Sequence, residues 1–246
     1  MDRLIYTAMT GASATMGLAA ALAHNLANAT STGFKTEMHK LRAVQVQNAQ
    51  MPTRAFVADA SVADDFSPGP LQHTNRGLDM AIQGKGWFAV QMPDGTEGYT
   101  RNGNFEVSAN GILQTRGGLP VLGTGGPITI PPDVEVAVGA DGSISTVPRS
   151  GARNSTSAVD QLKLVNPPEA ELRRGGDGFF RTAGGAAAPA DPAVRVASGY
   201  LEGSNVNVVE QMVSMISLAR QYEMQTKMLS TAQEMDRSST QLVAKA

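Results

Sequence analysis

Residues 207–246 read NVVEQMVSMISLARQYEMQTKMLSTAQEMDRSSTQLVAKA and predict the longest element of the chain. Asn207 can cap the first backbone N–H groups of a helix, and Glu210 stands where its side chain can reach back. No Pro or Gly follows, so we expect one helix of roughly 35–40 residues, about 55 Å long. Apolar residues recur at alternating spacings of four and three, which is typical of a coiled-coil seam. The seam consists of Val208, Met212, Met215, Ala219, Tyr222, Thr226 and Leu229.

The N-terminal residues show the same alternation, so the long helix has a candidate partner at the other end of the chain. This second seam consists of Ile5, Met9, Ala12, Met16, Ala19, Ala23 and Leu26. Residues 28–33 (NATSTG) then supply the polar residues and Gly that end a helix. Two ordinary helices packed on one globular core would also fit. The narrow, Ala- and Met-rich seams favour a coiled-coil stalk, in which the helices pair with each other and with copies in other subunits.

The middle of the chain has a different pattern. Residues 36–76 include Pro52, Pro68 and Pro70 and few apolar clusters, so we expect an extended connector. From residue 77 short strand candidates alternate with turn sequences such as Asn110-Gly111, which predicts an all-β domain over 77–201, a sandwich or open barrel. The fold class is therefore α+β: residues 1–35 and 202–246 form a discontinuous coiled-coil domain around a central all-β domain.

The composition argues against several classes of function. The net charge is −2 and charged residues make 17% of the 246 residues, which argues against a nucleic-acid binder that relies on a basic surface. The chain has no Cys, and its three His residues lack acidic neighbours at ligand spacing. Neither a nucleophile elbow nor a complete phosphate loop occurs. We expect no catalytic residues, no metal and no cofactor.

The N-terminus shows neither a secretory signal nor a membrane anchor. Its apolar residues are periodic, and no segment reaches 18 consecutive apolar residues. We therefore expect neither a cleaved signal peptide nor insertion into a membrane. Work outside the cytoplasm would need an export route that reads an uncleaved N-terminus.

Three segments in order along the chain carry a resemblance to a known family. Residues 25–35, NLANATSTGFK, resemble the signature of bacterial flagellar rod and hook proteins. Residues 204–210, SNVNVVE, followed by Met212, Ala219, Arg220 and Tyr222, are similar to the C-terminal signature of that family. Residues 77–110, with GKGWF at 84–88 and YTRNGNF at 99–105, are similar to the β domain of its longer members. The first residues, MDRLIYTAMTGA, are most similar to members of the proximal-rod type.

The resemblance implies a structural subunit of the flagellar basal-body rod, exported by the flagellar type III apparatus and located in the periplasm. It implies assembly with other rod subunits and with copies of itself through the terminal helices, so that the rod transmits motor torque. Two alternatives remain: a distal rod protein of the same family, or a secreted cell-wall-binding β protein. The residues expected at assembly contacts are Ile5, Met9, Met16, Asn25, Leu26, Asn28, Gly33, Phe34, Asn205, Asn207, Val208, Met212, Met215, Ala219, Tyr222 and Leu229.

Overall fold

The computed structural model describes residues 2–45, 55–148 and 156–243. Its described residues divide into two compact units. The helical unit draws on residues 1–29, 36–65 and 206–246, and the β unit draws on residues 30–35 and 66–205. Neither unit is a continuous stretch of sequence, because the chain enters and leaves each of them more than once.

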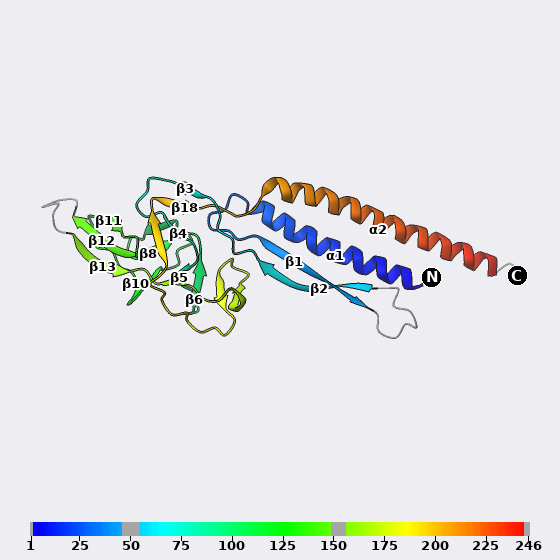
Figure 1. Ribbon diagram of the computed structural model, residues 1–246, viewed down its shortest axis with the longest axis horizontal. Helices are drawn as coiled ribbons and strands as arrows, with labels where there is room; N and C mark the ends of the chain where they lie inside the picture. The colour runs from blue at the N-terminus through cyan, green and yellow to red at the C-terminus, as the bar shows by residue number, and fades with distance from the viewer. Residues whose placement is uncertain (1, 46–54, 149–155, 244–246) are drawn as a thin grey trace. The chain divides into compact units, whose positions relative to one another are not determined.

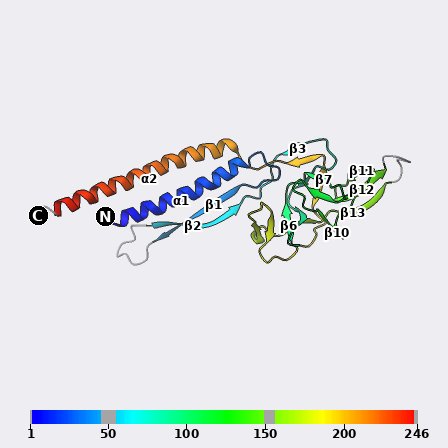
Figure 2. The ribbon, with the colours of Figure 1, turned by 180° about the vertical axis from the view of Figure 1, so that it is seen from behind.

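Two long antiparallel helices are the main elements of the helical unit (Figure 1 and Figure 2). Helix α1 spans Asp2–Ala27 and helix α2 spans Val208–Val243. The predicted cap of α2 is confirmed, because the backbone N of Glu210 donates to Asn207 Oδ1 at 3.3 Å. Both helices lie within a few residues of their predicted limits, since their ends are set by capping residues close by in the sequence.

A two-stranded ribbon completes the helical unit. Strand β1 (Glu37–Gln45) pairs antiparallel with β2 (Ala55–Asp64), and α1 lies between this ribbon and α2 (Figure 1). These strands occupy much of the segment that the sequence predicted to be an extended connector, so that part of the prediction is wrong. The apolar pattern missed the ribbon because two strands satisfy each other through backbone hydrogen bonds, which the pattern does not record.

The β unit consists of short strands in several small sheets. One sheet has five strands in the order β14-β5-β6-β16-β15, and another has three in the order β11-β12-β13. Two-stranded sheets pair β3 with β18, β4 with β17, β7 with β8 and β9 with β10. The all-β character is as predicted, but the strands are divided more finely than a sandwich or open barrel would require. The bounds are β3 Leu71–His73, β4 Met80–Gln83, β5 Trp87–Gln91, β6 Glu97–Thr100, β7 Phe105–Val107, β8 Leu113–Thr115, β9 Leu122–Gly123, β10 Gly126–Pro127, β11 Val134–Val138, β12 Ser143–Pro148, β13 Ser157–Gln161, β14 Leu164–Val165, a 3-10 turn Glu169–Glu171, β15 Leu172–Arg174, β16 Phe180–Thr182, β17 Arg195–Ser198 and β18 Tyr200–Glu202.

Strand β5 contributes to both apolar clusters of the β unit. Successive side chains of a strand point to opposite faces, so Phe88 and Val90 enter one cluster while Trp87 and Ala89 enter the other. The first cluster includes Phe105, whose ring meets Phe88 edge-on at 5.2 Å between centroids. Burial on both faces explains why β5 reads as a continuous apolar run. In the described part of the chain, no helix is long and apolar enough to cross a membrane.

Candidate assembly site

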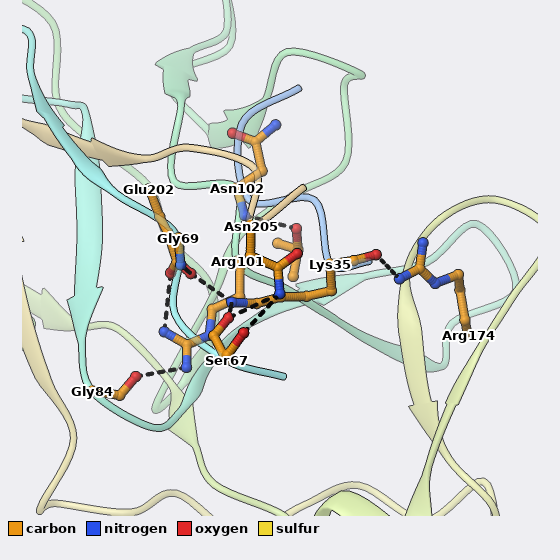
Figure 3. Close-up of polar contacts among 10 residues, drawn as sticks. Lys35, Ser67, Gly69, Gly84, Arg101, Asn102, Arg174, Glu202 and Asn205 are labelled. Atoms are coloured by element: carbon orange, nitrogen blue, oxygen red, sulfur yellow. Dashed lines mark hydrogen bonds and ion pairs between the residues drawn. The ribbon is translucent and has the colours of Figure 1, made fainter. Parts of the chain in front are cut away.

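A buried network of charged groups joins segments of the β unit that are far apart in the sequence (Figure 3). Lys35 Nζ donates to Glu202 Oε1 at 2.6 Å and to the carbonyl oxygen of Ser67 at 2.8 Å. Neither the Lys35 nor the Glu202 side chain is more than 1% exposed. Charges removed from water in this way depend on each other, because loss of one leaves the other uncompensated. Lys35 therefore holds the segment 30–35 in the β unit.

Arg101 is the second cation of this network. Its Nη1 donates to Glu202 Oε2 at 3.1 Å, and its Nη2 donates to the carbonyl oxygen of Gly84 at 2.7 Å. The guanidinium also lies 5.3 Å from the centroid of the Trp87 ring. Burial lowers the pKa of Arg101 from its usual value, and the Glu202 carboxylate acts in the opposite direction. Since Gly69 N donates to Glu202 Oε1 at 3.0 Å, one carboxylate receives donors from three segments.

Phe34 is held next to Lys35 by an arginine of strand β15. The guanidinium of Arg174 lies 4.9 Å from the centroid of the Phe34 ring and 5.0 Å from that of Phe180. Arg174 also donates to the carbonyl oxygen of Lys35. A cation placed between two aromatic rings is attracted to both. The predicted residue Phe34 is thus part of the β unit.

The two family-like segments at Gly33 and Asn205 lie side by side in the β unit. Gly33 N donates to the carbonyl oxygen of Glu202 at 2.7 Å, and Asn205 Nδ2 donates to the carbonyl oxygen of Ser67 at 3.1 Å. Gly33 has a φ of +69°, and a Cβ there would lie 2.4 Å from the backbone N of Asn102. Only glycine satisfies both conditions, because other residues disfavour this φ and their Cβ would clash.

Asn25 forms a corresponding junction in the helical unit. Its Nδ2 donates to the carbonyl oxygen of Glu37 at 2.8 Å, and its Oδ1 accepts from Glu37 N at 2.9 Å. The side chain, only 1% exposed, thereby satisfies the backbone at the start of β1. Asn28 contributes more locally, since its Nδ2 donates to the carbonyl oxygen of His24 at 3.0 Å.

Most apolar residues of the two predicted helix seams are not buried within the chain. Exposed members are Met9, Met16, Val208, Met212, Ala219 and Tyr222, while Leu26, Met215 and Leu229 are half-buried. The side chain of Ile5 lies outside the described residues. Asn207 is exposed and caps α2. The expectation that these seams pair the two helices within one chain therefore needs correction. Their role as contacts between subunits stays a prediction.

The sequence did not identify several residues that complete these junctions. Ser67, Arg101, Arg174 and Glu202 bind the segment at Lys35, and Gln211 lies 3.4 Å from Asn25 Nδ2. The one available signal was a charged residue directly after Gly33-Phe34, in a segment otherwise free of charge. It did not reveal the partners, because they come from distant segments.

Comparison with known proteins gives a consistent result along the chain. Residues 81–146 match the family model described as flagellar hook protein FlgE/F/G D1 domain, and residues 197–242 match the one described as flagellar basal body rod FlgEFG protein C-terminal. The flagellar basal-body rod protein FlgF of Salmonella typhimurium is 44% identical over 99% of each chain. FlgF of Caulobacter vibrioides is 36% identical over 91% of each chain. The rod protein FlgG of Agrobacterium fabrum is 32% identical over 95% of this chain and 96% of its own.

Proposed function

This chain belongs to the family of FlgF-type flagellar basal-body rod proteins, and we propose on that premise that it is a structural subunit of the proximal part of the rod. Its work is to form contacts with other rod subunits and with copies of itself. The terminal helices supply these contacts, and the β unit carries the buried network that keeps each subunit rigid.

The observation that carries this proposal is the row of large apolar side chains exposed on α2. A monomeric protein rarely leaves so many such residues exposed along one element, and such surfaces mark interaction sites. The exposed residues are Val209, Met212, Val213, Ile216, Met224, Met228 and Met235. The four Met side chains can adapt to neighbours of somewhat different shape, as contacts between non-identical rod subunits require.

The proximal position is favoured over the distal one by sequence similarity. The Salmonella FlgF is 44% identical to this chain, whereas the Agrobacterium FlgG is 32% identical. The similarity to FlgF covers 99% of the chain, so it includes the terminal helices as well as the β unit. A secreted cell-wall-binding β protein would have no need for the helices, and we do not favour that alternative.

The proposal includes the route to the rod. We infer that the chain passes through the flagellar type III export apparatus and keeps its N-terminus, so that it transmits motor torque in the periplasm at its full length. Mass spectrometry of the protein recovered from purified basal bodies tests this. Recovery of peptides from residues 2–27 supports export without cleavage, and a chain that lacks them contradicts it.

Imaging of purified basal bodies tests the structural role. A deletion of the gene in its own bacterium should stop rod growth and abolish spreading in soft agar, and the wild-type gene on a plasmid should restore both. Antibody against the β unit should label the rod in the restored strain. Complete rods in the deletion strain would contradict the proposal.

A further inference from the structure

The contact between α1 and α2 contains polar and small residues at two well-defined places. At the first, the Thr15 hydroxyl lies 3.2 Å from Gln225 Oε1 and 2.8 Å from the carbonyl oxygen of Gly11. The hydroxyl has one hydrogen, so it donates to one of these acceptors at a time. Thr15 is only 4% exposed, and a Cβ at Gly11 would lie 3.1 Å from Gln225 Nε2. The Gln225 amide thus occupies a notch that Gly11 leaves in α1.

The second place lies nearer the start of α2. Asn25 Nδ2 is 3.4 Å from Gln211 Oε1, and the same Asn25 amide is held by the backbone of Glu37 at 2.8 and 2.9 Å. Asn25 therefore has a fixed orientation when it meets Gln211. Both contacts are consistent with one antiparallel alignment, because the residue number rises from Thr15 to Asn25 on α1 as it falls from Gln225 to Gln211 on α2.

Polar contacts of this kind define an alignment that apolar contacts leave open. An apolar face displaced by one helical turn meets other apolar residues at little cost, whereas a displaced buried amide loses its hydrogen-bond partner. A single polar residue in a coiled-coil seam specifies register in this way. We infer that Gln211 and Gln225 fix the axial register of α2 against α1, and that they are specificity-determining residues of the helical unit.

The register decides where the exposed residues of α2 lie along α1. Ile216 and Met224, for example, take their axial positions relative to Met9 and Met16 from it. The consequence for rod assembly rests on the proposed function. The register itself does not, because it is a property of the single chain and can be measured without a rod.

Engineered cysteine pairs can measure the register, because the natural chain has no Cys. Ala8 and Ala232 stand seven residues from Thr15 and Gln225 in opposite directions, and each is 8% exposed. A heptad step on both helices of an antiparallel pair keeps residues facing, so Ala8→Cys with Ala232→Cys reports the native register. Ala8→Cys with Met228→Cys or with Met235→Cys reports displacement by about one turn.

Mild oxidation of the purified full-length chain should cross-link the native pair about tenfold more than either displaced pair, since a lost buried hydrogen bond of about 1.4 kcal/mol corresponds to a factor of ten. Gln225→Leu should reduce this preference to below about threefold, and Gln211→Leu with Gln225→Leu should remove it. Gln221→Leu is the matched control, because Gln221 is exposed on the same helix. It should keep the wild-type preference.

A second measurement separates register from stability. Leu in place of Gln at the contact should leave the thermal midpoint of the helices unchanged or higher, because a buried polar residue in a seam gives specificity at a cost in stability. Equal cross-linking of native and displaced pairs in the wild-type chain would overturn the inference. So would an unchanged native preference in the double variant, or a preference lost only in proportion to helix content. If register is lost while rods still assemble, the inference holds and the proposed link to assembly fails.

Discussion

The ammonium of Lys35 lies 2.6 Å from the carboxylate of Glu202, although 167 residues separate them along the chain. Lys35 closes the segment 30–35 and Glu202 ends strand β18, the last strand before α2. The pair therefore fastens both family-like terminal segments to the same point of the β unit. A rod subunit with this arrangement can transmit force from its ends into its β unit without unfolding.

Replacement of Lys35 by Met tests the weight of this ion pair. Lys35→Met keeps the length of the side chain but leaves a buried carboxylate with one cation fewer, so the free energy of unfolding should fall by about 3–5 kcal/mol. Urea denaturation of the full-length chain measures the change. Lys85→Met is the control, because Lys85 and its partner Glu169 are exposed, and it should cost no more than about 1 kcal/mol. Equal losses in the two variants would contradict the assigned role.

Replacement of Gly69 by Ala tests the packing around the network. A Cβ at Gly69 would lie 2.1 Å from the carbonyl oxygen of Gly203, so the backbone on one side must move. Gly69→Ala should lower the free energy of unfolding by about 2–3 kcal/mol, as is typical of overpacking. Gly176→Ala, where a Cβ meets nothing within 4 Å, should cost less than about 0.5 kcal/mol. Differential scanning calorimetry compares the two, and similar midpoints would count against the close approach.

Tyr99 predicts how stability depends on alkaline pH. Burial raises the pKa of Tyr99 to about 12 from its usual value of 10.0. Between these values the folded chain holds the phenolic proton more strongly than the unfolded chain does. Stability is therefore complete below pH 10 and falls as the pH rises from 10 to 12. Tyr99→Phe should flatten this part of the curve relative to wild type, which equilibrium unfolding across the range measures.

The same substitution has a separate effect at neutral pH. Ala188 N donates to the Tyr99 hydroxyl oxygen at 2.7 Å in the buried interior, so Tyr99→Phe should cost about 1–3 kcal/mol there by leaving that donor without its partner. A variant that loses nothing at pH 7 and follows the wild-type slope above pH 10 would show that the hydroxyl is not buried as described.

The exposed face of α2 predicts a variant that folds but does not assemble. Ile216 is 57% exposed, so Ile216→Asp should change the stability of the isolated chain by less than about 0.5 kcal/mol. A buried contact between subunits would not tolerate the charge, so soft-agar spreading and complete rods should be lost. Gln221→Asp introduces the same charge at an exposed polar position of α2 and should assemble normally. Normal motility of Ile216→Asp would place this face outside the rod contacts.

The sequence by itself determined the parts of this protein that depend on neighbours along the chain. The limits of both helices follow from local caps and from the absence of Pro and Gly in residues 208–243. The β character of residues 77–201 follows from strand-length apolar runs between turns. The family-like segments were also recognisable, because they are short runs of adjacent residues such as NLANATSTGFK.

The tertiary structure decided which faces and which charges meet. The predicted seams follow the largest apolar residues, such as Met16 and Met212, whereas the intrachain contact uses Thr15 and Gln211, each one residue earlier. One residue turns a helix by about 100°, so the seams lie on adjacent faces. Apolar periodicity shows that a face must be covered but does not say by which chain. In the same way, the pairing of Lys35 with Glu202 depends on the folding of the strands between them, so only the folded chain shows that these charges are buried together.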